Sequence, residues 1–238
     1  MKPTSTGANH TRTLMAFALA MMAATATYAQ EDPEYKMEVG GGLGLVTYMG
    51  DYNGNPTRSM QPMVTLMAKY RPNPRMAWAA MMSVGKLKGD EANTDTWYPR
   101  ETPDEPPYTF SHQMADIGLR FEYNFWPYGT GREYRGAKRL TPFMALGLGV
   151  SYANPHGTVI TGNAMLGAGV KYKVATRLNL TAEWNVHFSG NDNLDGRVDP
   201  YGIKRSGLFK NTDGYSVLRL SLTYDIWAKC KTCNNDRD

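Results

Sequence analysis

Apolar residues alternate with small or polar residues in eight separate segments, and this alternation constrains the fold of the chain more than any other feature. A period of two places successive side chains on opposite faces of a β-strand. In the segment 115–125, for example, Leu119 and Phe121 lie opposite Arg120 and Glu122. After residue 30, no stretch shows the period of a helix. The segments are 35–45, 62–70, 76–84, 115–125, 144–152, 166–173, 178–188 and 218–226.

The connections between these segments alternate in length. The expected turns are Arg71–Pro74 and about Val174–Arg177, which are short, and Trp126–Leu140, which is intermediate. The expected loops are Gly50–Met60, Lys88–Ser111, Asn154–Gly162 and Gly190–Thr212, of which two are long and rich in Asp, Asn, Gly and Pro. Long loops at one end and shorter turns at the other are typical of outer-membrane barrels. We therefore predict an all-β fold, an eight-stranded antiparallel up-and-down transmembrane β-barrel of the outer membrane.

A soluble secreted barrel, such as a lipocalin, would show the same alternation, because a period of two does not say which face points inward. Three features favour the membrane. The polar face is thin and rich in Gly, Ala, Ser and Asn, which suits a narrow interior. The apolar face is uniform over strands of roughly ten residues, which is enough to cross the hydrocarbon layer when the strands are tilted. The chain also lacks the helix and the early Gly-x-Trp signature of lipocalins.

Aromatic residues gather near the strand ends, as in the interfacial girdles of membrane proteins. The girdle candidates are Tyr35, Tyr70, Trp78, Trp126, Tyr152, Tyr172, Phe188, Tyr224 and Trp227.

Other classes of protein are excluded by the hydropathy and the charge of the chain. Only the apolar run 14–26 approaches the length of a membrane-spanning helix, so the chain is not a multi-helix membrane protein. The net charge of +4 is mild for 238 residues, and no basic stripe interleaved with aromatics suggests nucleic acid.

The N-terminus is typical of an export signal. Lys2 and Arg12 are positive, an apolar stretch follows from Leu14, and small residues around Ala29 fit a cleavage site. The alternative, an uncleaved anchor helix, needs a longer apolar run. We predict a signal peptide at residues 1–29, a barrel at 30–228 and a short periplasmic tail at 229–238.

The alternation places acids and bases together on the inward face. They could form a polar conduit or a proton site, but eight strands leave little room for an open pore. Unpaired buried charges are also costly. We therefore favour a polar network that plugs the lumen. The predicted network is Glu38, Asp116, Arg120, Glu122, Lys171, Glu183, Arg219 and Asp225.

His187 and Ser189, with Glu183 on the same face, resemble the histidine–serine pair of outer-membrane lipid A deacylases. In that enzyme the active groups face the lipid, where the substrate lies. Here Trp184 and Phe188 take the lipid side, so His187 and Ser189 point inward or lie at the rim. We expect no enzyme activity, no catalytic residue and no cofactor, and the scattered histidines do not suggest a metal site.

Two features at the periplasmic side are candidates for contact with a partner protein. The connection Trp126–Leu140 is basic, and Cys230 and Cys233 follow the last strand. In an exported protein, such a Cys-x-x-Cys pair can be a tight disulfide, a redox pair or half of a metal site. No helix follows and no second pair of cysteines exists, so we expect a local disulfide or a covalent link to a partner. The predicted contact residues are Arg132, Arg135, Lys138, Arg139, Cys230 and Cys233.

Several short motifs, taken in order, are similar to the PorG-like outer-membrane proteins of the Bacteroidetes. Each motif alone is weak, and together they span about residues 35–233. They are Gly40–Gly44 followed by Tyr48–Asp51, Asn73–Arg75, Phe121–Tyr128, Thr141–Phe143 with Leu146–Gly149, Gly169–Tyr172, Asn193–Gly196, Leu222–Tyr224 and the terminal Cys-x-x-Cys.

The resemblance implies a non-enzymatic component of the type IX secretion machinery. Proteins of that family associate with a periplasmic ring built by the PorK lipoprotein and PorN. The expected partners are therefore outer-membrane lipid and a ring of PorK-like and PorN-like proteins. The alternatives are a structural or surface-binding porin-like barrel that acts through Lys88–Ser111 and Gly190–Thr212, or a lipid A-modifying enzyme.

Overall fold

The computed structural model describes residues 34–50, 57–90, 109–130, 136–155, 157–190 and 213–228. All of these residues belong to one compact unit, Pro33–Asp238. The other unit, Met1–Asp32, contains the predicted signal peptide and is not among the described residues. The predicted tail, 229–238, also lies outside the described residues. The strands are β1 (Tyr35–Met49), β2 (Gln61–Asn73), β3 (Met76–Asp90), β4 (Thr109–Asn124), β5 (Leu140–Ala153), β6 (Val159–Lys173), β7 (Leu178–Ser189) and β8 (Gly214–Ala228).

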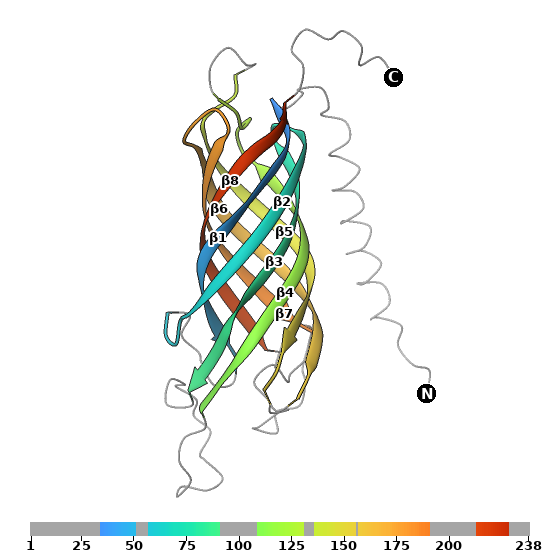
Figure 1. The fold of residues 1–238 in the computed structure, drawn as a ribbon, viewed down its shortest axis with the longest axis vertical. Coiled ribbons are helices and arrows are strands. Elements are labelled where there is room, and N and C mark those ends of the chain that lie inside the picture. The colour runs from blue at the N-terminus through green and yellow to red at the C-terminus, as the bar shows by residue number, and fades with distance from the viewer. Residues whose placement is uncertain are drawn as a thin grey trace, which may run out of the picture. The chain divides into compact units, whose positions relative to one another are not determined.

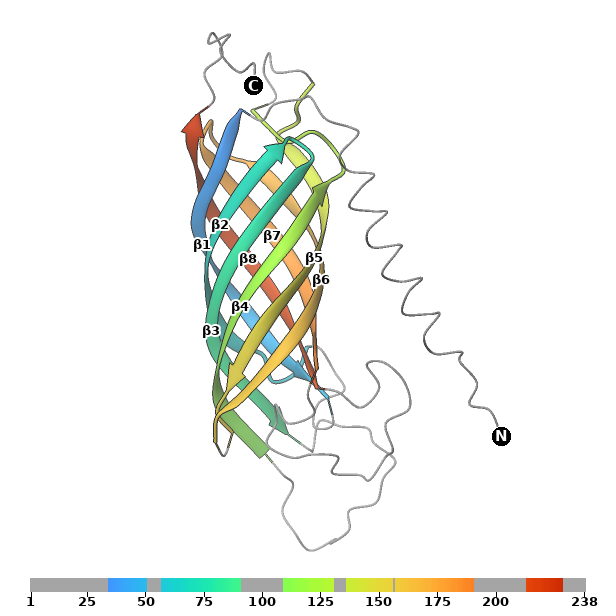
Figure 2. The same ribbon diagram turned by 90° about the vertical axis from the view of Figure 1, so that its right-hand side faces the viewer.

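Each strand pairs antiparallel with the next, and β1 pairs with β8, which closes the barrel (Figures 1 and 2). At one end Tyr35 pairs with Ala228, and at the other Met49 pairs with Gly214. The prediction of a closed eight-stranded antiparallel barrel is confirmed. We call the end with Tyr35, Ala228 and the connections β2–β3, β4–β5 and β6–β7 the turn end. The opposite end, with the two longest connections, β3–β4 and β7–β8, is the loop end.

Several strands are longer than the alternation indicated. Lys88–Asp90 belong to β3 and Thr109–Ser111 to β4, so both ends of the expected loop Lys88–Ser111 are strand. Phe110 is buried in the lumen, which shows that the inward and outward alternation continues there. β6 likewise begins at Val159, within the expected loop Asn154–Gly162.

The expected turn Arg71–Pro74 is also shorter than predicted, because β2 continues to Asn73. The turn itself is made by Pro74 and Arg75. Arg71 is therefore a strand residue whose side chain points into the lumen, where it is buried. Leu140 is the first residue of β5 rather than the end of a turn.

The outer face of the barrel is apolar along all eight strands. Leu43 and Leu148 are 70% and 72% exposed, as are many other large apolar side chains to a lesser degree. Most of the expected girdle aromatics are exposed too, but Tyr35 is 7% exposed and lies under the cationic groups of Lys173 and Arg177. The prediction that Tyr35 faces lipid was therefore wrong. No helix among the described residues is long and apolar enough to cross a membrane.

Glycines on the inner face allow the strands to approach closely. A Cβ atom at Gly40 would lie 2.3 Å from the carbonyl oxygen of Leu222, so β1 and β8 could not pair as they do with a larger residue there. A Cβ atom at Gly147 would lie 2.7 Å from Cβ of Arg120. The small residues of the inner face thus make room for long charged side chains from other strands.

Candidate functional site

The carboxylate of Glu183, on β7, binds two arginine side chains at the centre of the lumen. Arg120 of β4 donates to its Oε2 atom from Nη2 at 2.7 Å. Arg219 of β8 donates to its Oε1 atom from Nε at 2.5 Å. All three side chains are buried. One carboxylate therefore joins three strands through two guanidinium groups.

A second carboxylate, that of Glu122 on β4, lies nearer the turn end. It accepts hydrogen bonds from Nε of Arg120 at 2.8 Å and from Nζ of Lys171 at 2.6 Å. Nζ of Lys69 lies 3.4 Å from its Oε1 atom. These contacts connect the centre of the lumen to its half towards the turn end.

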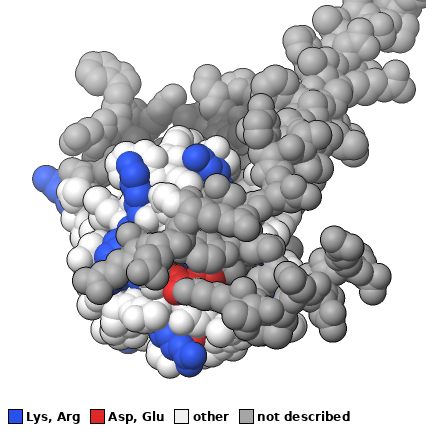
Figure 3. All heavy atoms as spheres, turned by 90° about the horizontal axis from the view of Figure 1, so that it is seen from above, with Lys and Arg blue, Asp and Glu red and all other residues white. Residues whose placement is uncertain are grey.

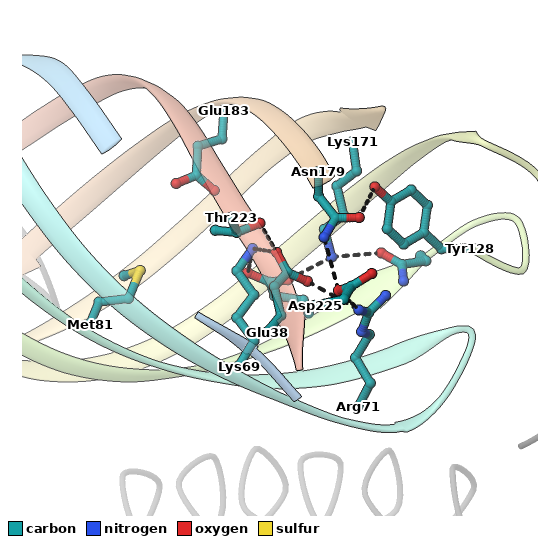
Figure 4. Close-up of polar contacts among 12 residues, drawn as sticks. Glu38, Lys69, Arg71, Met81, Tyr128, Lys171, Asn179, Glu183, Thr223 and Asp225 are labelled. Atoms are coloured by element: carbon teal, nitrogen blue, oxygen red, sulfur yellow. Dashed lines mark hydrogen bonds and ion pairs between the residues drawn. The ribbon is translucent and has the colours of Figure 1, made fainter. Parts of the chain in front are cut away.

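Glu38 and Asp225 complete the charged cluster close to the turn end (Figure 4). Asp225 pairs with both Arg71 and Lys173. Glu38 lies 3.6 Å from Nη2 of Arg71 and 3.7 Å from Nζ of Lys69. Every charged group of this cluster is therefore within reach of an opposite charge, which is the arrangement that buried ions require.

We call these ten residues the lumen network. Seven of them were predicted from the inward alternation, and Lys69, Arg71 and Lys173 were not. Its four carboxylates face six cationic groups, so the network carries two more positive than negative charges. Its members are Glu38, Lys69, Arg71, Arg120, Glu122, Lys171, Lys173, Glu183, Arg219 and Asp225.

The eighth predicted residue, Asp116, lies apart from this network. Its Oδ2 atom accepts hydrogen bonds from Ser151 at 3.0 Å, Asn163 at 2.7 Å and Tyr215 at 2.9 Å. It forms no ion pair with any described residue. Asp116 therefore belongs to a separate polar group in the half of the lumen towards the loop end.

An apolar cluster fills the part of the lumen near the loop end. Its members point inward and are buried, although the alternation alone predicted a polar interior. Tyr48 packs edge-on against Phe110, with ring centroids 5.1 Å apart, and its hydroxyl donates to Asp213. We call this cluster the apolar layer; it consists of Val46, Tyr48, Met63, Leu87, Phe110, Met114, Ala153, Tyr215 and Val217.

The mouth at the turn end is covered by Tyr128, from the connection between β4 and β5. Its hydroxyl donates to Oδ1 of Asn179 at 2.8 Å. Its ring centroid lies 5.8 Å from Cζ of Arg71 and 5.7 Å from Nζ of Lys173. Tyr128 is held in place because its backbone N donates to the carbonyl of Pro74 at 3.0 Å. Burial raises the pKa of Tyr128, and the nearby Glu38 carboxylate raises it further.

His187 and Ser189 both lie inside the barrel. His187 stacks on Tyr215, with ring centroids 4.3 Å apart, and its Nδ1 atom is 3.4 Å from Oδ1 of Asn163. The hydroxyl of Ser189 is 3.1 Å from that of Thr161. Both side chains are buried, so neither is presented to lipid. Within the described part of the chain, no group of three His, Cys, Asp or Glu residues could hold a metal ion.

The predicted contact residues that the structure describes are Lys138 and Arg139. Both are exposed at the turn end. Nζ of Lys138 lies 4.6 Å from the ring centroid of Trp126, and Nε of Arg139 donates to the carbonyl of Thr130 at 2.7 Å. Figure 3, which views the barrel from this end, shows basic side chains around its edge. Arg132, Arg135, Cys230 and Cys233 lie outside the described residues.

A closed barrel with an apolar outer face and a charged, filled interior suits a membrane rather than water. Residues 15–204 match the family described as outer membrane protein beta-barrel domain. The chain belongs to that family. We therefore place the turn end of this outer-membrane barrel in the periplasm and the loop end, which carries the two longest connections, outside the cell, as is usual for such proteins.

Solved structures with a similar fold share little sequence with this outer-membrane barrel. Neisserial surface protein A is 13% identical over 80% of this chain and 97% of its own, with a TM-score of 0.48. Ail of Yersinia pestis, in complex with the heparin analogue sucrose octasulfate, is 10% identical over 81% and 99%, with a TM-score of 0.46. OprG of Pseudomonas aeruginosa is 9% identical over 84% and 100%, with a TM-score of 0.47. No curated protein matches the chain.

Proposed function

We propose that this outer-membrane barrel is a non-enzymatic anchor of the type IX secretion machinery, which holds a periplasmic ring of PorK-like and PorN-like proteins at the membrane. The filled lumen carries this proposal. Arg120, Glu183 and Arg219 are joined across its centre, and Tyr128 covers its periplasmic mouth. A barrel filled in this way offers partners its ends rather than a passage.

The resemblance to PorG-like proteins supports the choice of partner. The connection between β4 and β5 is at the turn end and carries four basic residues, of which Lys138 and Arg139 are exposed. The other two, Arg132 and Arg135, are expected to extend the same positive surface. Such a surface attracts an acidic face of a partner protein and determines how the partner is oriented.

A surface-binding barrel is the second candidate. The observation that favours it is the apolar layer, which supports the bases of the extracellular loops from within through residues such as Phe110 and Tyr48. A rigid base would hold Lys88–Ser111 and Gly190–Thr212 in a fixed position for a ligand outside the cell.

Affinity capture of the tagged full-length protein from crosslinked outer membranes tests the anchor. Mass spectrometry should recover the PorK-like lipoprotein and its PorN-like partner. Replacing Arg132, Arg135, Lys138 and Arg139 with glutamine should reduce that recovery, and Cys230→Ser with Cys233→Ser tests the tail separately. The control is Arg58→Gln, Lys86→Gln and Lys88→Gln, which removes exposed basic residues at the loop end.

The outcomes separate the candidates. Loss of the ring proteins in the turn variant but not in the control supports the anchor. Recovery of the barrel without ring proteins overturns it. Deletion of the gene then distinguishes the rest, because an anchor is needed for protein secretion, whereas a surface-binding barrel is needed for adhesion or envelope integrity. An altered mass of lipid A would instead support an enzyme.

A further inference from the structure

In each of the three periplasmic turns, an exposed basic side chain contacts either the side chain or the backbone carbonyl of an aromatic residue that faces the lipid. Arg75, in the β2–β3 turn, donates from Nη1 to the carbonyl of Phe125 at 2.9 Å. Lys138, between β4 and β5, lies 4.6 Å from the ring centroid of Trp126. These contacts place a positive charge just beyond the aromatic girdle at two points of the rim.

The third point is Arg177, in the β6–β7 turn. Its Nη1 atom lies 3.5 Å from the hydroxyl oxygen of Tyr224, and its guanidinium lies over Tyr35 at 5.5 Å from the ring centroid. Arg177 is exposed, and Tyr224 lies on the outer face. We call Arg75, Lys138 and Arg177 the rim cations.

Negative charge is scarce at the same level of the barrel. Among the described residues of the turn end, Glu34 is the one carboxylate that is not buried, and its Oε2 atom already accepts a hydrogen bond from the backbone N of Thr130. The carboxylates of Glu38 and Asp225 are buried and paired inside the lumen. Within the described part of the turn end, positive charge therefore exceeds exposed negative charge, and the lumen network beneath the rim cations adds to this excess.

We propose that the rim cations bind the phosphate groups of anionic glycerophospholipids in the periplasmic leaflet of the outer membrane. Aromatic girdles lie at the level of the lipid headgroups, so a cation just beyond the girdle meets the phosphates. The acyl chains pack on the apolar outer face beside Leu140 and Tyr172, which are exposed next to Lys138. An acidic protein would also be attracted, but it would not need cations that each contact the side chain or the backbone of a lipid-facing aromatic residue.

This proposal is independent of the secretion role, because it needs the barrel and lipid alone. The test uses Trp126 as a local reporter, with the other four tryptophans replaced by phenylalanine. The protein is placed in phosphatidylcholine vesicles that hold equal fractions of brominated phosphatidylglycerol or brominated phosphatidylcholine. Bromine quenches the fluorescence of a nearby tryptophan, and the ratio of the two quenching constants measures preference for the anionic lipid. The replaced residues are Trp78, Trp97, Trp184 and Trp227.

We expect a ratio of about two to five in favour of phosphatidylglycerol, since a basic residue at an anionic surface contributes an effect of that order. High salt should lower the ratio towards one. Arg75→Gln, Lys138→Gln and Arg177→Gln together should do the same at low salt. Arg75→Lys, Lys138→Arg and Arg177→Lys keep the charge and should keep the ratio.

The matched control removes three exposed basic residues at the loop end, through Arg58→Gln, Lys86→Gln and Lys88→Gln. Because Trp126 lies at the other end, this control should leave the ratio unchanged. Heat modifiability on gels verifies that every variant is folded. A ratio near one in the unaltered rim, or equal ratios in the rim and loop variants, would overturn the proposal.

Discussion

Arg120 of β4 and Glu183 of β7 meet across the lumen, with 2.7 Å between Nη2 and Oε2. β4 and β7 are not neighbours in the barrel and share no backbone hydrogen bonds. The ion pair therefore fastens two walls that the strand pairing leaves unconnected. Arg219 holds the other oxygen of the same carboxylate, so Glu183 is the group on which the centre of the network depends.

Replacing Glu183 with glutamine should destabilise the barrel severely. The substitution leaves two buried guanidinium groups, those of Arg120 and Arg219, without their shared carboxylate. Breaking a buried ion pair in this way lowers the free energy of unfolding by about 3–5 kcal/mol. Urea unfolding of the protein in lipid vesicles, followed by tryptophan fluorescence, measures the change.

A double-mutant cycle provides the control for this prediction. Glu183→Gln combined with Arg219→Gln should cost less than the sum of the two single changes, because the second removes a charge that the first leaves unpaired. Glu34→Gln, at the partly exposed mouth, should change the free energy of unfolding by less than about 1 kcal/mol. Strict additivity would show that the network does not act as one unit.

The barrel should not conduct ions. The lumen network fills its centre and periplasmic half, the apolar layer fills the other half, and Tyr128 covers the mouth. Planar-bilayer recordings with the purified protein should show a flat baseline at voltages where a porin, recorded in parallel, gives clear steps. Reproducible current steps from the purified barrel would contradict the description of a filled lumen.

Gly40→Ala should weaken the closure between β1 and β8. The new Cβ atom would meet the carbonyl oxygen of Leu222 at 2.3 Å and Cα of Thr223 at 2.6 Å, and neither backbone can yield without separating the strands. Overpacking of this kind costs about 1–3 kcal/mol. Heat modifiability and urea unfolding report the loss.

Gly118→Ala is the matched control for this change. Its new Cβ atom would lie 3.4 Å from the carbonyl oxygen of Leu148, which is an ordinary contact. The free energy of unfolding should therefore remain close to that of the unaltered protein. Equal losses in both variants would show that the close approach of β1 and β8 is not the cause.

Tyr128 should make the barrel sensitive to alkali. Burial raises its pKa above the ordinary value of 10.0, so the folded state keeps the hydroxyl neutral while the unfolded state ionises. The stability that the neutral hydroxyl contributes is complete below about pH 10 and is lost as the pH rises towards the raised pKa. The lost hydrogen bond to Asn179 should make Tyr128→Phe less stable by about 1 kcal/mol at neutral pH.

Comparison of alkaline unfolding curves tests this prediction. Above pH 10 the difference between Tyr128→Phe and the unaltered protein should shrink and then reverse. Tyr70→Phe is the control, because Tyr70 is exposed on the outer face and should show no such crossover. Parallel curves for the unaltered protein and Tyr128→Phe would argue against a buried, hydrogen-bonded hydroxyl.

The fold was predictable from sequence because strand alternation is a local property. Leu119 and Phe121 face outward, and Arg120 and Glu122 face inward, because successive side chains of a strand point to opposite faces. The same rule placed Lys173 opposite the apolar residues of its segment, although Lys173 was not included in the predicted network. It would also have placed Lys69 in the lumen had it been applied to every residue of β2. Only Arg71 was hidden, because Pro72 and Pro74 suggested that the strand ends before it.

The partners of each charge were not predictable in the same way. The meeting of Arg120 with Glu183 depends on the tilt and stagger of eight strands around the barrel, and alternation within one strand contains no information on either. The apolar layer was missed for a different reason. Inward residues such as Val46, Leu87 and Phe110 contradict the rule of a polar interior, so the ends of their strands resembled loops.

The pairing of β1 with β8 has a consequence for biogenesis. Tyr35 and Ala228 lie close to opposite ends of the described chain, yet they face each other in the adjacent strands β1 and β8. Until the last strand arrives, the first has an open edge that no hydrocarbon layer tolerates. Insertion of a partly exported chain is therefore unproductive, and the polypeptide must be kept unaggregated in transit until its final strand is available.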